Sequence, residues 1–140
     1  MREANPTNIL RSGGAILAGV STVIVLSLGT DVILHSTGVY PPWFQPMADA
    51  LWVLALAYRI VYGVLGGYLA ARLAFNNSMK HALIVGFIGL ALTIVGVALN
   101  WNKGPEFGPK WFSIALVLAA LPCAWAGGKL VIARPRSQTA

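Results

Sequence analysis

This chain has 140 residues, of which 57% are hydrophobic and only 10% are charged, and its mean hydropathy is +0.72. Soluble globular domains carry about 25% charged residues. The composition therefore excludes an ordinary soluble domain and predicts an integral membrane protein.

Long apolar runs divide the chain into four predicted helices. They cover about residues 9–34, 47–74, 82–100 and 111–132. Each is long enough to cross a bilayer, since a spanning helix needs about 20 mostly apolar residues. We therefore expect an all-α fold in which residues 1–140 form a single integral membrane domain, a four-helix transmembrane bundle. Too little chain lies outside the runs to build a separate soluble catalytic unit.

The first apolar run differs from a signal peptide, although Arg2 and Arg11 resemble a basic n-region. Its apolar stretch, residues 13–34, is longer than the h-region of a signal peptide. The residues that follow it contain no A-x-A cleavage pattern. We therefore expect a retained helix, followed at residues 39–46 by a turn rich in proline and aromatic side chains that suits the membrane–water interface.

Basic residues are distributed unevenly between the two sides of the predicted bundle. One side would hold Arg2, Arg11, Arg72, Lys80, Lys129, Arg134 and Arg136, and the other only Lys103 and Lys110. Because basic residues favour the cytoplasmic side, we expect both termini in the cytoplasm. The net charge of +6 therefore reflects membrane topology, and it does not require a nucleic-acid partner. The lipid bilayer is the expected partner.

The two predicted hairpins resemble each other. The segment GGYLAAR at 66–72 has a counterpart in GGKLVIAR at 127–134, and each follows an outer turn that contains proline and a Trp-Phe pair. A duplication would make the hairpins a parallel repeat about an axis along the membrane normal. Similar packing requirements at equivalent depths would produce the same pattern, so both interpretations stand.

Small residues recur along predicted helix faces, where they allow close backbone approach between membrane helices. The candidate packing residues are Gly63, Gly67, Gly86, Gly89 and Gly96. Packing within the bundle explains such stripes, and a homo-oligomer contact is the alternative.

Two ionisable residues, Asp31 and Arg59, lie inside the predicted spans, where charges are costly and mark candidate functional sites. Ser27 and His35 share a helix face with Asp31, and Tyr62 lies near Arg59. The depths predicted for Asp31 and Arg59 let an extended arginine side chain reach the carboxylate. The pair is either a structural link between helices or a proton- or anion-binding site with His35 as a titrating neighbour. A site for a partner subunit or a lipid headgroup is a third interpretation.

The sequence offers no candidate for catalysis, a metal or a cofactor. His35 and His81 would lie at opposite faces of the membrane, so they cannot share one haem iron. The lone Cys123 forms neither a disulfide within the chain nor a cysteine-based metal cluster. We find no phosphate-binding loop and no nucleophile motif in the sequence. We therefore expect a protein that is not an enzyme.

Four stretches carry a resemblance to known proteins: LGTD at 28–31, YRIVYGVLGGY at 58–68, MKHAL at 79–83 and LPCAWAGG at 121–128. They resemble those of small four-helix bacterial membrane proteins with no assigned activity. The resemblance implies a multi-pass protein of the bacterial inner membrane, and it brings no catalytic residues. The small multidrug exporters are similar in size and helix number and use a carboxylate in their first helix. Here Asp31 lies nearer the outer end, and Arg59 would neutralise it.

We therefore expect a small non-enzymatic inner-membrane protein that acts as an accessory or oligomer-forming component, with itself or a membrane partner subunit. The alternative is a small transporter or channel-like subunit that uses Asp31 and Arg59. The interior of the bundle distinguishes the two. A water-filled cavity that reaches Asp31 favours transport, and a closed, dry pair favours a structural role.

Overall fold

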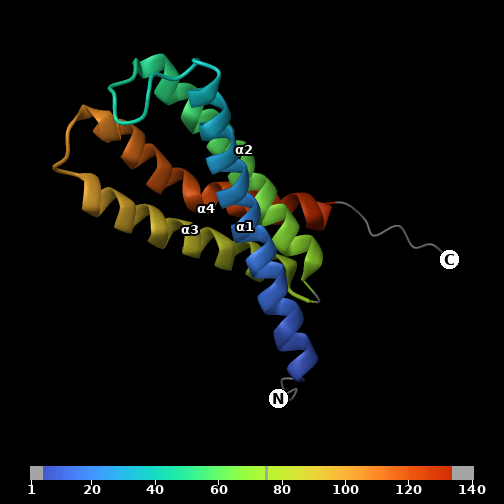
Figure 1. Ribbon diagram of the computed structural model, residues 1–140. Helices are drawn as coiled ribbons and strands as arrows, with labels where there is room; N and C mark the ends of the chain where they lie inside the picture. Colours follow the sequence, from blue (N-terminus) through green and yellow to red (C-terminus); the bar gives the residue numbers. More distant parts are fainter. Residues whose placement is uncertain (1–4, 75, 134–140) are drawn as a thin grey trace.

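The computed structural model describes residues 5–74 and 76–133. These residues form four α-helices and one 3-10 turn, drawn in Figure 1. The elements are α1 (Pro6–Ser36), α2 (Asp49–Leu73), α3 (Ser78–Asn100), η1 (Pro105–Phe107) and α4 (Lys110–Ala133). The described ranges contain no strand, so the predicted all-α class is confirmed for them.

All four helices are long and apolar enough to cross a membrane, as a multi-pass protein requires. The shortest, α3, has 23 residues, and its length of about 34 Å exceeds the hydrocarbon thickness of about 30 Å. The 31 residues of α1 span about 46 Å, and its first turns extend beyond the rest of the bundle (Figure 1). An even number of crossings would place the start of α1 and the end of α4 on one side.

The helices α1 and α3 begin earlier than apolarity predicts. α1 begins before the predicted residue 9 because the Asn5 side chain accepts a hydrogen bond from the Thr7 N–H at 3.3 Å. Pro6 also has a φ that suits a first helical turn. α3 begins at Ser78 rather than at residue 82, directly after the left-handed Asn77 at φ +48°. The limits of α2 and α4 differ from the predicted ones by at most two residues.

Glycines bring the helix backbones into direct contact in the half of the bundle near the 74–78 turn. A methyl group on Gly19 of α1 would lie 2.7 Å from the Gly66 carbonyl oxygen of α2. A methyl group on Gly67 would likewise lie 2.7 Å from the carbonyl oxygen of Ala124 in α4. Side chains larger than hydrogen are therefore excluded at both crossings.

The predicted packing glycines fall into two groups. A methyl group on Gly63 would lie 3.1 Å from the Cys123 Cβ atom, and one on Gly86 would lie 2.7 Å from a methyl group of α4, so both face a neighbouring helix. Packing within the bundle is not found at Gly89 and Gly96 among the described residues, and the alternative homo-oligomer contact stays a prediction. A methyl group on either would have no described atom within 4 Å outside its own stretch of α3, because α3 diverges there from the helices it would contact.

The pairs Gly66-Gly67 and Gly127-Gly128 meet where α2 and α4 cross. A methyl group on Gly127 would lie 2.9 Å from the Gly67 carbonyl carbon. This contact gives the shared motif a packing role, and the hairpin repeat itself stays a prediction. Arg2, Arg134 and Arg136, on which the predicted topology partly depends, lie outside the described residues.

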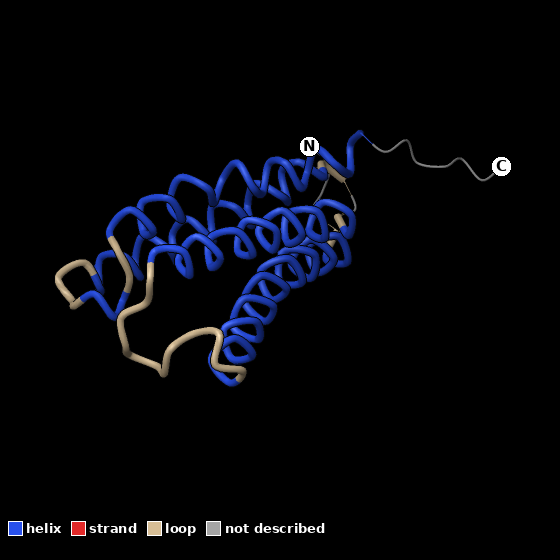
Figure 2. Tube along the Cα trace, turned by 90° about the horizontal axis from the view of Figure 1, so that it is seen from above, coloured by secondary structure: helices blue, strands red, loops and turns tan. Residues whose placement is uncertain are grey.

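The helices fan out from the 74–78 turn toward the two longer loops, as Figures 1 and 2 show. Aromatic side chains join these loops at the wide end. The rings of Phe44 and Phe107 lie 6.2 Å apart, and those of Trp52 and Phe112 lie 4.8 Å apart. Tyr40 is buried beneath them, with 3% of its surface exposed. These ring contacts connect the two hairpins at the wide end. By contrast, α1 packs only sparsely against α3.

Candidate functional site

Asp31 and Arg59 form an ion pair between α1 and α2. The Arg59 Nη2 atom lies 2.6 Å from the Asp31 Oδ2 atom. The Arg59 side chain is 26% exposed and the Asp31 side chain is 14% exposed. Arg59 lies about 15 Å along α2 from its first residue, so the pair is well inside the apolar part of the hairpin. Each residue neutralises a charge that would otherwise be costly at that depth.

Tyr58 of α2 is hydrogen-bonded to both members of the ion pair. The Tyr58 hydroxyl donates a hydrogen bond to Asp31 Oδ1 and accepts one from Arg59 Nη1 at 3.2 Å. Arg59 Nη1 also approaches the carbonyl oxygen of Ala55 at 3.5 Å. Both carboxylate oxygens of Asp31 therefore have a donor, and the guanidinium is fixed by α2 itself.

Tyr40 extends this network into the loop between α1 and α2. Its hydroxyl group lies 3.3 Å from the Tyr58 hydroxyl and 3.4 Å from the Leu51 carbonyl oxygen. Burial is the main cause that raises the pKa of the Tyr40 phenol above its ordinary value of 10.0. Because burial disfavours the phenolate, Tyr40 stays a neutral donor.

Aromatic rings flank the guanidinium group. The Arg59 Cζ atom lies 5.2 Å from the ring centre of Tyr58 and 5.8 Å from that of Phe112 on α4. Attraction between the cation and these ring faces adds to the ion pair. Arg59 therefore links α1, α2 and α4.

The other predicted site residues occupy three different places. Tyr62 shares a hydrogen bond of 2.7 Å with Thr30, adjacent to the pair. Ser27 lines a cavity next to the pair. His35 makes its hydrogen bond outside the pair: its Nδ1 atom lies 2.7 Å from the Pro41 carbonyl oxygen, and its ring lies 3.6 Å from that of Trp43. Its ring also lies 5.3 Å from that of Tyr40, so His35 borders the network through Tyr40, and its predicted role as a titrating neighbour stays a prediction.

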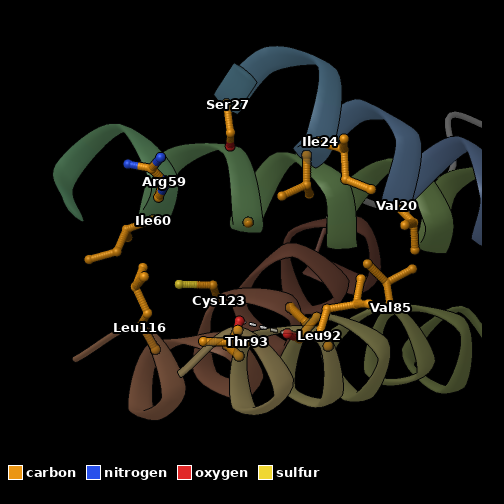
Figure 3. Close-up of a pocket in the computed structure, with 18 of the residues that line it drawn as sticks. Val20, Ile24, Ser27, Arg59, Ile60, Val85, Leu92, Thr93, Leu116 and Cys123 are labelled. Atoms are coloured by element: carbon orange, nitrogen blue, oxygen red, sulfur yellow. Dashed lines mark hydrogen bonds between the residues drawn. The ribbon is translucent and has the colours of Figure 1, made fainter. Parts of the chain in front are cut away.

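A cavity of about 750 Å³ extends between the four helices and reaches both Asp31 and Arg59. Figure 3 shows Arg59 at one end of this cavity and Val20 and Val85 at the other, with Thr93 between them. Ile24 and Leu28 on α1 and Leu92 on α3 line it and remain 43%, 58% and 56% exposed. We call this cavity the α1–α3 groove, because α1 and α3 contribute most of the residues that line it.

The groove has few polar groups besides the ion pair. Thr93 and Asn100 line its α3 wall. Each donates a hydrogen bond to a carbonyl oxygen of α3 itself, Thr93 to Gly89 at 2.7 Å and Asn100 to Gly96 at 2.8 Å. The open glycines Gly89 and Gly96 form the surface between them. Beyond Gly86, which contacts α4, the α3 stripe predicted to pack against a helix lines the groove instead.

Sequence reasoning missed three parts of this site. Tyr58 was recognisable only as a neighbour of Arg59, and its sequence position does not distinguish it from Tyr62. Tyr40 is separated from Tyr58 by 18 positions, and only the return of the loop brings them together. The groove has no sequence signal, since the apolar residues that line it resemble those that face lipid.

The arrangement places an ion pair at one end of an apolar groove. Asp31 and Arg59 cancel each other's charge, and the hydroxyls of Tyr58 and Tyr62 are hydrogen-bonded. Among the described residues no group of three or more His, Cys, Asp and Glu side chains is placed to hold a metal ion. An apolar groove with a few polar groups at one end is typical of a ligand site.

Comparisons of the chain with protein-family models, curated proteins and solved structures found no match. The resemblance to small four-helix bacterial membrane proteins therefore stays a prediction, and the site must be interpreted from its own geometry.

Proposed function

We propose that this chain is a small non-enzymatic protein of the bacterial inner membrane that binds a lipid-soluble molecule in the α1–α3 groove, as a small transporter or transporter subunit does. The observation that carries this proposal is the cavity of about 750 Å³ that reaches Asp31 and Arg59. A pair that served only to fix two helices would not need a cavity beside it. The cavity volume lies within the roughly 300–1,000 Å³ range of ligand sites.

The proposed orientation places both termini in the cytoplasm. Arg72 and Lys80 flank the 74–78 turn at the narrow end of the bundle, and Lys103 and Lys110 flank η1 at the wide end. Arg134 and Arg136 follow the end of α4 in the sequence. Basic residues favour the cytoplasmic side, so the aromatic wide end faces outward.

A second function is favoured by a separate observation, the open glycines of α3. Gly89 and Gly96 have no described atom within 4 Å of an added methyl group, and small residues invite helix contact in membranes. An accessory or oligomer-forming role would use this surface for a helix of a second copy or of a partner subunit. The Asp31–Arg59 pair would then be a structural link between α1 and α2.

Native mass spectrometry of the full chain, purified from bacterial membranes in mild detergent, tests the two functions against each other. A bound small molecule on the monomer is expected, and its loss in Gly89→Leu would place it in the groove. Gly29→Leu is the matched control, because Gly29 is also open to its surroundings but does not line the groove.

A dimer or a partner complex that Gly89→Leu disrupts would favour the accessory function instead. A monomer without any bound molecule in every preparation would contradict the proposed ligand function.

A further inference from the structure

The groove is elongated. Along α1 it runs from Val20 to Asp31, which is roughly 16 Å at 1.5 Å per residue. An extended chain can lie along this length between α1 and α3.

The entrance of the groove faces the apolar surroundings of the helices. The half-exposed side chains of Ile24, Leu28 and Leu92 form its rims. Charged side chains occur only at its far end, at Asp31 and Arg59. A molecule would thus enter sideways from the bilayer, with an apolar body and a polar group at one end.

Arg59 has hydrogen-bond donors at the polar end without a partner in the described ranges. A guanidinium carries five N–H donors, and among the described residues Arg59 directs three of them, toward Ala55, Tyr58 and Asp31. The Nε–H and one Nη2–H remain. The Ser27 hydroxyl lines the groove and makes no hydrogen bond to another described residue. An acceptor group on a ligand would therefore pair with the remaining Arg59 N–H groups.

We infer that the α1–α3 groove binds an uncharged long-chain acyl ester of the monoacylglycerol class. Its chain lies between α1 and α3, and its ester carbonyl accepts a hydrogen bond from Arg59. This inference rests on the proposed ligand function and names the class of ligand. The ester supplies two acceptor oxygens and no charge, and the two glycerol hydroxyls can pair with Ser27 or with the remaining lone pairs of Asp31.

Charge decides against the related lipids that carry an ionised head. A fatty-acid anion would place a second negative charge beside Asp31 and compete with it for Arg59. An alkylammonium head would compete with Arg59 for Asp31 in the same way. Charges interact several-fold more strongly in such surroundings than in water, so either head would be disfavoured.

Photolabelling of the full chain in maltoside micelles tests this inference. The probes are a monoacylglycerol, a fatty acid and a fatty amine that carry the same diazirine in the same chain, and mass spectrometry locates the labelled residues. We expect the ester to label groove residues of α1 and α3 at least about tenfold more than the acid or the amine, a factor that corresponds to about 1.4 kcal/mol.

Groove-filling variants provide the controls. Gly89→Leu should reduce labelling by the ester at least about tenfold, and Gly29→Leu should leave it unchanged. Gly96→Leu repeats the test if Gly89→Leu does not fold, since Gly96 is equally open. Unchanged labelling in a folded groove-filling variant would overturn the inference and the proposed ligand function together.

The two proposals can fail separately. Equal labelling of the groove by all three probes, lost in Gly89→Leu, would leave the ligand function standing and overturn the inference about the ester. Crosslinks from the groove to a second copy of the chain would overturn both and identify a helix as the occupant.

Discussion

Arg59 and Asp31 meet across the α1–α2 interface although 28 positions separate them, and Tyr58, the residue next to Arg59, is hydrogen-bonded to both. The pair is therefore held by a third group that belongs to α2. Losing either charge leaves the other without its counter-charge, and leaves the Tyr58 hydroxyl with one fewer partner.

A double-mutant cycle measures the strength of this relationship. We expect Asp31→Asn and Arg59→Gln each to destabilise the bundle, because each leaves a partly buried charge without its partner. The double variant should lose less than the sum of the two, with a coupling of about 0.5–3 kcal/mol. Thermal unfolding of all four proteins in one detergent gives this value, and strictly additive losses would contradict a coupled pair.

Gly67 should be far less tolerant of a methyl group than Gly29. In Gly67→Ala the new Cβ atom would lie 2.7 Å from the Ala124 carbonyl oxygen and 2.8 Å from the Ala124 Cα atom, and backbone cannot yield as a flexible side chain does. Overpacking of this kind costs about 1–3 kcal/mol, so the unfolding temperature should fall.

Gly29→Ala is the control for Gly67→Ala. Gly29 has no described atom within 4 Å of an added methyl group, and alanine is favoured over glycine in a helix by about 1 kcal/mol. Its unfolding temperature should be unchanged or higher. Equal losses in the two variants would show that the α2–α4 crossing is looser than the structure indicates.

The helices and the ion pair could be predicted because their signals are local or rare. Apolar runs longer than a bilayer is thick give the spans directly, and Asp31 and Arg59 are charged residues within such runs. An intramembrane arginine requires a partner, and Asp31 lay at a depth it could reach.

The groove and the place of His35 depend on angles that no residue pattern encodes. Gly86 and Gly89 look alike in sequence, yet only Gly86 is crowded by α4, because α3 diverges beyond it. His35 is one helical turn from Asp31, but the loop after Ser36 turns back and offers it the Pro41 carbonyl oxygen. Such long-range geometry decides which small residues pack and which line a cavity.

Cysteine labelling tests the proposed orientation. In a Cys123→Ala background, Asn76→Cys should react with a membrane-impermeant maleimide only after the cells are opened, because the 74–78 turn is proposed to be cytoplasmic. Asn102→Cys should react on intact cells. Both positions are exposed, so access does not depend on unfolding. The reverse pattern would invert the proposed topology and place the aromatic loops on the cytoplasmic side.

The stability of the bundle should fall above pH 10, in part through Tyr40. Burial raises the pKa of Tyr40 above 10.0 in the folded chain, so the unfolded chain loses this proton first. The stabilisation is therefore complete below the pKa of the unfolded chain and decreases as the pH rises through the pKa of the folded chain.

Tyr40→Phe should lower stability by about 0.5–1.5 kcal/mol at pH 8, because it removes the hydroxyl that bonds to Tyr58 and Leu51. It should also reduce the further loss between pH 10 and 11 in thermal unfolding. A loss in Tyr40→Phe as steep as that of the unaltered chain would show that other groups cause the alkaline transition.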